Sequence, residues 1–218
     1  MNPRPFIILA LLVALSPAVV RADGLQDDVD QAVTILQRFQ DMPEQSIPQW
    51  VLRDARGLAI LTVAKAGFIV SARGGTGIVV ARTRNGWSGP SAIATGGAGF
   101  GFQVGAEVSE FVIALNTDEA VKAFSRGGNV ALGADLSVAA GPVGRSVGTD
   151  VTLKSAVYTY SRSQGLFAGV SLEGTVLATR NDANAKYYGK HVNAADILSG
   201  RVKPPAGAKR LLRDLSKH

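Results

Sequence analysis

The placement of glycine constrains the fold of this chain more than any other feature of its sequence. Of the 25 glycines in 218 residues, 21 lie between Gly57 and Gly174, without a fixed period. In strands, glycine is typical of bulges, sharp bends and places where two backbones approach closely. The short apolar runs between these glycines have the length of strands rather than of helices. We therefore expect a strongly bent or closed antiparallel sheet in this region.

Helical patterns flank and interrupt this region. Apolar residues recur at spacings of three and four over residues 23–41, which predicts an amphipathic helix. A short helix is expected after Pro48, because proline suits a first helical turn. Residues 116–119 form a capping-box pattern, which predicts a helix over residues 119–125. The expected fold class is α+β, mainly antiparallel β: a Gly-rich curled sheet or barrel-like sandwich with an N-terminal helix, one inserted helix and C-terminal helices.

One β-hairpin is expected near the start of the sheet. Two apolar runs, residues 67–71 and 76–81, flank the dipeptide Gly74-Gly75, which is typical of two-residue hairpin turns. In that hairpin Arg73 and Arg82 would lie on the same face. Both faces carry apolar residues, which favours a central position in the fold. The other strands are expected over residues 58–63, 102–109, 111–115, 130–139, 151–162 and 166–179.

The first 22 residues are typical of a secretory signal peptide. Arg4 precedes an uncharged stretch from Phe6 to Val20, and small residues stand at the positions before the expected cleavage after Ala22. An uncleaved membrane anchor is the alternative, but an anchor needs about 20 apolar residues. We expect residues 23–218 to form a single domain that is exported to the periplasm.

The composition disfavours an enzyme that depends on histidine or cysteine. The chain has no cysteine and only two histidines, His191 and His218. It therefore has no disulfide framework, no thiol nucleophile and no Cys-based metal site. We expect a binding or structural protein, with no cofactor and no metal.

Two sets of residues leave a catalytic alternative open. Ser146 lies in a G-x-S-x-G sequence, but a nucleophile elbow needs a strand before it and a helix after it, and glycine-rich and β-branched residues flank this one. Carboxylates also stand within expected strands and could perform acid–base chemistry or hold a cation. Structural ion pairs or exposure to solvent are the favoured interpretation of these residues, Glu107, Glu110, Asp135 and Glu173.

Charge is distributed unevenly along the chain. Residues 23–54 carry seven acids and two arginines, whereas residues 55–106 carry five basic residues and no acid. Residues 186–218 carry eight Lys or Arg and two Asp. If folding does not mix these charges, such asymmetry indicates a basic surface that meets an anionic partner.

Several segments of the sequence resemble the SYLF lipid-binding domain family. The most specific is Tyr160-Ser-Arg-Ser-Gln-Gly-Leu-Phe-Ala-Gly-Val-Ser-Leu-Glu-Gly174, and the others are residues 64–68 with 77–82, 87–93 with 99–107, and 132–145. The resemblance covers approximately residues 30–198. It implies binding of membrane phospholipids without known catalysis. Eukaryotic members carry SH3 or FYVE modules and bind phosphoinositides and actin, and bacterial members are stand-alone secreted proteins. The resemblance provides no site motif that transfers residue by residue.

The candidate lipid-binding residues therefore come from the distribution of basic residues. Arginine suits phosphate because its planar guanidinium donates paired hydrogen bonds. The acid-free region and the resembling segments supply Lys65, Arg73, Arg82, Arg84, Arg145 and Arg162. We expect at least some of these to contact phosphate.

A basic amphipathic helix is expected at the end of the chain. Lys209, Arg213 and Lys217 recur every four residues, and Leu211 and Leu215 lie on the opposite face with Ala208 and Leu212. Such a helix can lie at a bilayer interface, but docking onto the domain is favoured because so few leucines bury little surface.

The leading hypothesis is a non-catalytic periplasmic protein that binds anionic phospholipid at a membrane surface. The alternatives are a scaffold for an acidic envelope partner and a serine or carboxylate hydrolase. No nucleic acid partner is expected, because no recognition motif is present.

Overall fold

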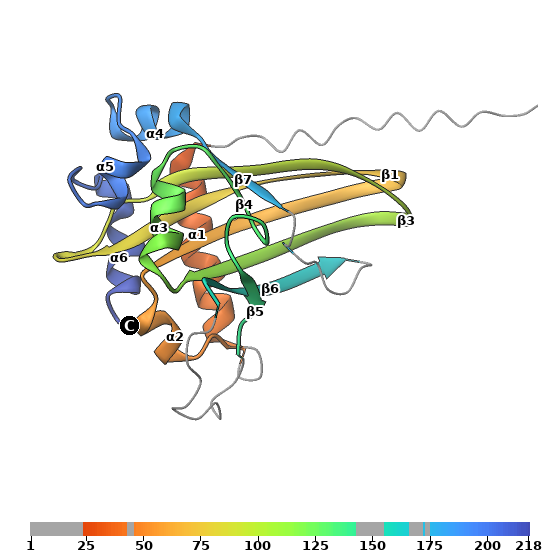
Figure 1. Ribbon diagram of the computed structural model, residues 1–218, viewed down its shortest axis with the longest axis horizontal. Helices are drawn as coiled ribbons and strands as arrows, with labels where there is room; N and C mark the ends of the chain where they lie inside the picture. Colours follow the sequence, from red (N-terminus) through yellow and green to blue (C-terminus); the bar gives the residue numbers. More distant parts are fainter. Residues whose placement is uncertain (1–23, 43–45, 143–154, 166–171, 173–174) are drawn as a thin grey trace, which may run out of the picture.

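The computed structural model describes residues 24–42, 46–142, 155–165, 172 and 175–218. The helices are α1 (Leu25–Gln40), α2 (Gln49–Asp54), α3 (Asp118–Ser125), α4 (Asn181–Tyr188), α5 (Ala194–Leu198) and α6 (Lys209–Leu215). The strands are β1 (Gly57–Thr83), β2 (Gly86–Trp87), β3 (Ser91–Leu115), β4 (Asn129–Ala131), β5 (Val138–Ala140), β6 (Val157–Gly165) and β7 (Val176–Thr179). Figure 1 shows their arrangement.

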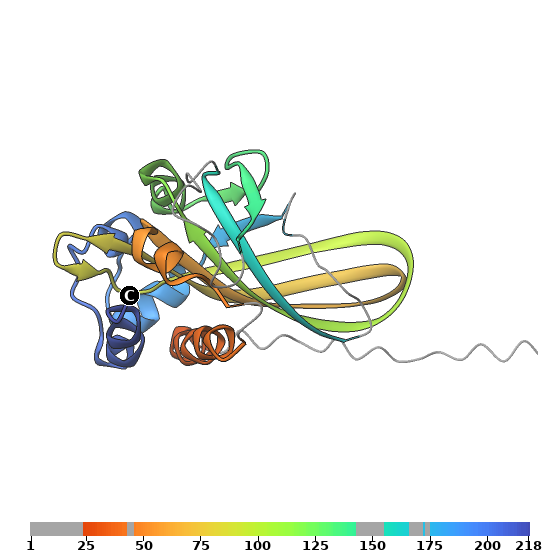
Figure 2. The ribbon, with the colours of Figure 1, turned by 90° about the horizontal axis from the view of Figure 1, so that it is seen from below.

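Two very long strands form the centre of the sheet. β1 has 27 residues and β3 has 25. They pair antiparallel from Gly57 opposite Leu115 to Val79 opposite Ser91, with a register shift between Phe68 and Val70. Figure 2 shows that this two-stranded ribbon bends back on itself at one end of the molecule. The fold class predicted from the glycine pattern, an α+β protein with a curled antiparallel sheet, is confirmed.

The short strands extend this ribbon at its edges. β6 pairs antiparallel with the second half of β3, and β5 adds to β6 in parallel. Near the start of β3, β7 pairs antiparallel with it and β4 pairs with β7. β2 pairs with the last residues of β1. Within the described residues the sheet therefore has seven strands, paired antiparallel except for β5 and β6.

The hairpin predicted at Gly74-Gly75 is wrong. Both residues lie within β1, where Gly74 pairs with Gly96 and Gly75 pairs with Thr95. A Cβ added at Gly75 would lie 2.3 Å from the carbonyl oxygen of Thr62, and one at Gly77 would lie 2.1 Å from that of Ile60. These glycines therefore allow the two halves of one bent strand to touch, and the turn itself comes later, between β1 and β2.

This correction changes the expected placement of two arginines. Arg73 and Arg82 stand nine positions apart in one uninterrupted strand. Because side chains alternate between the two faces of a strand, an odd separation puts them on opposite faces. The prediction that they share a face is wrong for the same reason as the predicted hairpin.

The sheet separates two hydrophobic cores. Leu58 and Ile60 of β1 pack in one core against Val29, Leu36 and Phe39 of α1. The neighbouring residues Ala59 and Leu61 pack in the other core, together with Phe111 of β3 and Phe124 of α3. Strand alternation assigns consecutive residues to opposite cores, so α1 and α3 lie on opposite sides of the sheet (Figure 2).

The predicted helices are observed close to their expected bounds. The helix predicted after residues 116–119 is confirmed, but its N-cap is Thr117 and not Asn116: the Thr117 side chain accepts a hydrogen bond from the backbone N–H of Ala120 at 3.1 Å, and the Asn116 N–H donates to Ala156 instead. The region of residues 130–139 forms two short strands instead of one, because a turn at residues 132–135, with Gly133 at φ 93°, interrupts it. The expected signal peptide and residues 151–154 lie outside the described residues. In the described part of the chain, we find no helix with both the length and the apolar character that crossing a membrane requires.

Candidate functional site

Basic side chains gather at the end of the molecule opposite the bend of β1 and β3. α4, α5, α6 and the turn between β1 and β2 lie together there (Figure 1). The three helices α4, α5 and α6 contain three acids. Asp196 pairs with Arg201 at 2.9 Å and Asp214 pairs with Lys217 at 2.8 Å, and Asp182 is exposed on α4. The contact with Lys217 also lowers the pKa of Asp214. Residues 181–218 therefore carry eight Lys or Arg against three acids, so positive charge is in excess at this end.

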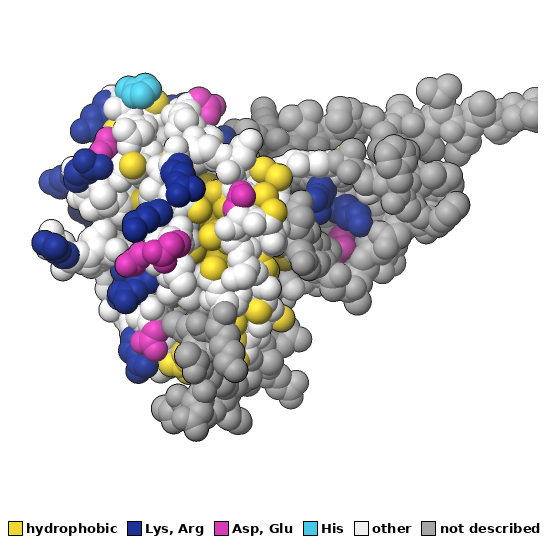
Figure 3. Space-filling model, in the orientation of Figure 1, with side chains coloured by type: hydrophobic (Ala, Val, Ile, Leu, Met, Phe, Trp, Pro, Cys, Tyr) yellow, Lys and Arg dark blue, Asp and Glu magenta, His cyan; other side chains and the backbone are white. Residues whose placement is uncertain are grey.

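Seven exposed cations at this end form no ion pair within the part of the chain that the structure describes. They are Arg84, Lys186, Lys190, Lys203, Lys209, Arg210 and Arg213. We call this set the basic end. Figure 3 shows Lys and Arg side chains gathered in this region on the face in view, with some acidic side chains among them.

The sequence of α6 explains how part of the basic end forms. Leu211 and Leu215 are fully buried against α1, and Trp87 donates an indole N–H to the carbonyl oxygen of Leu215 at 3.2 Å. Residues four apart share a helix face, so Lys209 and Arg213 face solvent together. The favoured prediction for this helix, docking on the domain with an exposed basic side, is confirmed.

Two of the predicted lipid-binding residues, Arg82 and Arg162, use their guanidinium groups in contacts within the protein. The guanidinium of Arg82 lies 4.5 Å from the centre of the Trp87 ring and donates to the carbonyl oxygen of Leu52 at 3.1 Å. Burial lowers the pKa of this arginine. Arg162 donates to Glu110 at 3.3 Å.

The other predicted residues divide between the two ends of the molecule. Lys65 and Arg73 lie toward the bend, where Lys65 is opposite Glu107 and Arg73 is opposite Gly97. Arg84, Lys209 and Arg213 belong to the basic end, and Lys217 lies beside it in its pair with Asp214. Arg145 lies outside the described residues. The nine predicted cations therefore do not form one cluster.

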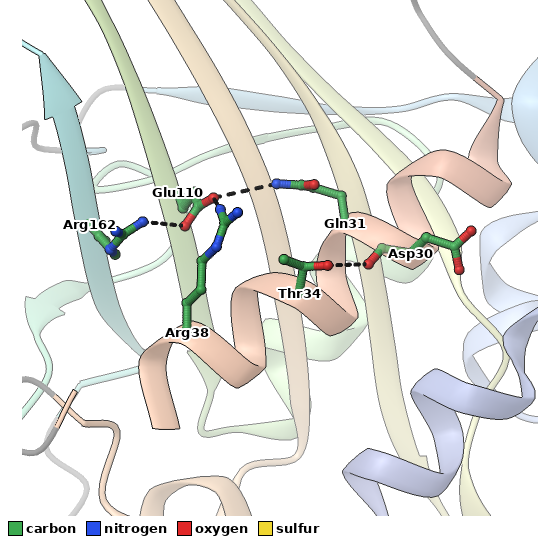
Figure 4. A network of polar contacts seen from close by, with 6 residues as sticks. All are labelled: Asp30, Gln31, Thr34, Arg38, Glu110 and Arg162. Atoms are coloured by element: carbon green, nitrogen blue, oxygen red, sulfur yellow. Dashed lines mark hydrogen bonds and ion pairs between the residues drawn. The ribbon is translucent and has the colours of Figure 1, made fainter. Parts of the chain in front are cut away.

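A buried carboxylate fixes α1 to the sheet. Glu110 of β3 accepts hydrogen bonds from Arg38 and, at 3.4 Å, from Gln31, both on α1. Its other oxygen accepts from Arg162 of β6 (Figure 4). Thr34 in the same figure donates to the carbonyl oxygen of Asp30 within α1. The favoured reading of Glu110 as a structural ion pair is confirmed.

A second buried carboxylate holds the start of α1. Asp28 accepts a hydrogen bond of 2.6 Å from the Thr76 hydroxyl and pairs with Arg180 at 3.1 Å. Arg180 directly precedes α4, and Thr76 lies in β1. α1 is therefore tied to the sheet near both of its ends.

The remaining carboxylates give no catalytic arrangement among the described residues. Glu107 is buried with 2% of its surface exposed and accepts from the Ser109 hydroxyl at 2.9 Å; of the two alternatives expected for it, an ion pair or exposure to solvent, exposure is therefore excluded. Asp135 is exposed and accepts from the backbone N–H of Ala131 in a turn. Ser146 and Glu173 lie outside the described residues. Within the described ranges no group of three His, Cys, Asp or Glu could hold a metal ion.

Among the described residues, pockets lie beside α1 at three places. One of about 270 Å³ lies between α1 and β1, beside Asp28 and Thr76. A second of about 420 Å³ lies between the start of α1 and α4, where burial raises the pKa of Tyr187 to about 12. The third, of about 500 Å³, lies between the end of α1, α2 and His218.

Four members of the basic end were not singled out from the sequence. No spacing rule connects these four residues. Lys186 lies in α4 and Arg210 in α6, whereas Lys190 and Lys203 lie in the loops after α4 and α5. The signal that could have found them is the charge count of residues 186–218, because two acids cannot neutralise eight cations.

Comparison with known proteins gives consistent matches. Residues 96–218 match the family described as "Las17-binding protein actin regulator" (Ysc84). The human protein named "SH3 domain-containing YSC84-like protein 1" is 51% identical over 196 residues, which are 86% of this chain and 57% of the relative. "Protein YSC84" of Saccharomyces cerevisiae is 48% identical over 202 residues, 88% of this chain and 43% of the relative.

A second yeast relative, "LAS seventeen-binding protein 3", is 50% identical over 202 residues, again 88% of this chain and 44% of the relative. The chain thus spans between 43% and 57% of the length of these relatives.

Proposed function

The chain belongs to the Ysc84 family of Las17-binding protein actin regulators, and we propose that it is a non-catalytic module that binds anionic phospholipid at a membrane surface. The observation that carries this proposal is the basic end. Its seven exposed cations have no ion-pair partner among the described residues. Anionic headgroups would supply the missing counter-charges.

The expected strength of this interaction follows from the number of cations. Each Lys or Arg near an anionic membrane surface contributes about 1 kcal/mol. If about four of them contact the surface at once, they contribute about 4 kcal/mol, which corresponds to roughly a thousandfold increase in binding. Exposed charges are screened within about 8 Å at physiological salt, so this contribution must weaken as salt is added.

The location that fits this proposal is the periplasm. Residues 1–22 have the layout of a secretory signal, and cleavage after Ala22 would release a chain that starts at Asp23. Cell fractionation and sequencing of the N-terminus of the purified protein test this part of the proposal. A protein that retains Met1 and stays in the cytoplasm contradicts it.

A protein ligand at the same surface is the second candidate function. The name of one yeast relative, "LAS seventeen-binding protein 3", and the description of the family record binding to Las17. The basic end suits an acidic protein surface for the same electrostatic reason that it suits lipid headgroups. Pull-down with the purified protein after removal of lipid distinguishes the two, because only a protein ligand survives that treatment.

Flotation with vesicles tests the leading proposal. The purified protein is mixed with vesicles of phosphatidylglycerol and phosphatidylcholine, or of phosphatidylcholine alone, at increasing salt. We expect recovery with the anionic vesicles only and a steady loss of binding as salt rises. Equal recovery with both kinds of vesicle excludes an electrostatic contact with the lipid.

A further inference from the structure

A half-buried guanidinium lies on the face of the sheet that carries the core around Phe111. Arg73 stands six positions before Val79 of that core in β1, and an even separation puts both on one face. Within the described residues Arg73 forms no hydrogen bond and no ion pair. It is directly opposite Gly97 of β3, and a Cβ built at Gly97 would lie 3.2 Å from its Nε atom. The side chain of Arg73 therefore reaches across β3 at this glycine.

Two buried threonines share this face, and neither Oγ1 atom has a hydrogen-bond partner among the described residues. Thr95, 8% exposed, precedes Gly97 by two residues in β3. Thr175, 1% exposed, precedes Leu177 of β7 by two residues, and Leu177 is opposite Thr95. The carbonyl oxygen of Thr175 accepts from the N–H of Leu132 at 2.9 Å, which continues the pairing of β4 with β7. Strand alternation therefore puts both hydroxyls on the face of Arg73.

The spacing of the strands brings these three side chains within reach of one ligand. β3 lies between β1 and β7, and neighbouring strands are about 4.8 Å apart. Arg73 crosses β3 at Gly97, and the register of β7, continued by two residues, places Thr175 on the far side of that glycine. Arg73 and Thr95 are diagonal neighbours, about 7–8 Å apart, which a long side chain spans. Gly97 itself is exposed, so a ligand can approach this position from solvent.

The charge and the donors of this set suit a phosphate group. Lys65 of β1 and Glu107 of β3 stand on the same face opposite each other, so together they add no net charge beside Arg73. A half-buried guanidinium has lost part of its hydration and favours an anionic partner. Its planar fork donates paired hydrogen bonds to phosphate, and each hydroxyl can donate one more. Phosphate has enough oxygens to accept from all three side chains, whereas a carboxylate has only two.

We propose that Arg73, Thr95 and Thr175 bind one phosphate group above Gly97. The bound phosphate supplies the hydrogen-bond partners that these three side chains otherwise lack among the described residues. The phosphate can belong to a lipid headgroup or to a soluble compound. This site goes beyond the proposed function, because none of its residues belongs to the basic end, which lies opposite the bend of β1 and β3 (Figure 1).

Titration calorimetry with inorganic phosphate at constant ionic strength tests the role of the guanidinium. We expect saturable binding to the purified protein at millimolar phosphate. Arg73→Gln should weaken this binding by roughly tenfold or more, because it removes hydrogen bonds between charged groups. Arg84→Gln is the matched control, since it removes the same charge from an exposed residue of the basic end. Phosphate binding by Arg84→Gln should equal that of the unaltered protein.

Two matched threonine variants test the role of the hydroxyls. Thr175→Val should weaken phosphate binding by roughly tenfold. It should not lower the urea midpoint of the phosphate-free protein, because the hydroxyl has no hydrogen bond to lose among the described residues. Thr62 also has a buried Oγ1 atom without a partner, but it lies on the other face of the sheet, beside α1. Thr62→Val should therefore leave phosphate binding unchanged.

Three results overturn the inference: no saturable binding of phosphate, equal binding by Arg73→Gln and Arg84→Gln, or equal effects of the two threonine variants.

Flotation with phosphatidylglycerol vesicles at fixed salt identifies the source of the phosphate group. If phosphate binding is lost in Arg73→Gln and vesicle binding is weaker than in Arg84→Gln, the site holds a lipid headgroup. If phosphate binding is lost but vesicle binding is equal in the two variants, the site holds a soluble phosphate compound. Phosphate binding without any binding to vesicles supports the site and overturns the proposed function alone.

Discussion

Replacing Gly77 by alanine should strongly destabilise the protein, because the bend of β1 brings two stretches of backbone together at this residue. A Cβ at position 77 would lie 2.1 Å from the carbonyl oxygen of Ile60 and 2.6 Å from the Cα of Leu61. Contacts between real Cβ atoms and backbone essentially never fall under 3.0 Å, so the two segments must separate by about 1 Å. Both segments of β1 are buried, so their separation disrupts the packing of the hydrophobic core on each side of the sheet.

The expected magnitude is at the upper end of overpacking effects. Adding one carbon to a well-packed core costs roughly 1–3 kcal/mol and occasionally more. Here the obstacle is backbone and not the end of a flexible side chain, so we expect a loss of about 3 kcal/mol in the free energy of unfolding. For a domain of this size, that loss lowers the melting temperature by roughly 6–12 °C.

Gly74 provides the matched control three residues earlier in the same strand. A Cβ there would meet nothing closer than 4.0 Å, the carbonyl oxygen of Thr95. Because alanine restricts the unfolded chain more than glycine does, Gly74→Ala should be neutral or stabilising by about 0.5 kcal/mol. Urea unfolding followed by circular dichroism measures both variants. If Gly77→Ala unfolds at the same urea concentration as Gly74→Ala, the two halves of β1 do not touch as described.

Three further predictions concern the contacts that hold α1, α3 and α4. Glu110→Gln removes a buried charge that pairs with both Arg38 and Arg162. Because these two arginines are part-exposed, we expect urea unfolding to show a loss of about 2 kcal/mol in the free energy of unfolding. An unchanged urea midpoint would show that these ion pairs do not stabilise the fold. Thr117→Ala removes the side chain that caps α3 and should lower the free energy of unfolding by about 1 kcal/mol. Thr117→Ser keeps a hydroxyl at the cap and should lose much less stability. Equal stability of the two variants would contradict a capping role for Thr117. Burial raises the pKa of Tyr187 to about 12 from the ordinary 10.0, so the folded state holds this proton more tightly, and the resulting stability is present below pH 10 and lost as pH rises toward 12. Phenylalanine cannot ionise, so between pH 10 and 12 the unfolding midpoint of the wild type should fall relative to that of Tyr187→Phe, and parallel curves would exclude the shift.

The sequence predicted those parts of the fold that depend on residues close to one another along the chain. The periodic apolar residues of α1 and the cap at Thr117 are local signals, and both elements are observed. The dipeptide Gly74-Gly75 is also a local signal, but the hairpin that it predicts does not form. The hydrogen-bond partners of these glycines are Gly96 and Thr95, about twenty residues away, and the close contact that requires glycine at positions 75 and 77 lies with Thr62 and Ile60. Only the three-dimensional path of the strand determines that contact.

The same distinction applies to the candidate site. The spacing of Lys209 and Arg213 predicted one exposed helix face, and the structure shows it. Arg82 and Arg162 looked equally suitable for phosphate, but Trp87 and Glu110 engage them through contacts that no sequence spacing encodes. The pocket beside α2 joins the end of α1 to the last residue of the chain, so a pattern confined to one segment could not reveal it.

Charge neutralisation on two opposite helices tests the central claim most directly. Two helices each carry an exposed Lys and Arg four residues apart, with no ion pair among the described residues. On α6 they are Lys209 and Arg213, and at α3 they are Lys122 and Arg126. α6 packs together with α1 in one hydrophobic core, whereas α3 packs in the other core. The two Lys–Arg pairs therefore face opposite sides of the sheet.

The measurement is the affinity of each double variant for phosphatidylglycerol vesicles at fixed salt. At about 1 kcal/mol for each cation, Lys209→Gln with Arg213→Gln should weaken binding by roughly thirtyfold. Lys122→Gln with Arg126→Gln, which removes the same net charge, should change it less than threefold. Equal losses in the two double variants would show that overall charge, and not the basic end, attracts the membrane.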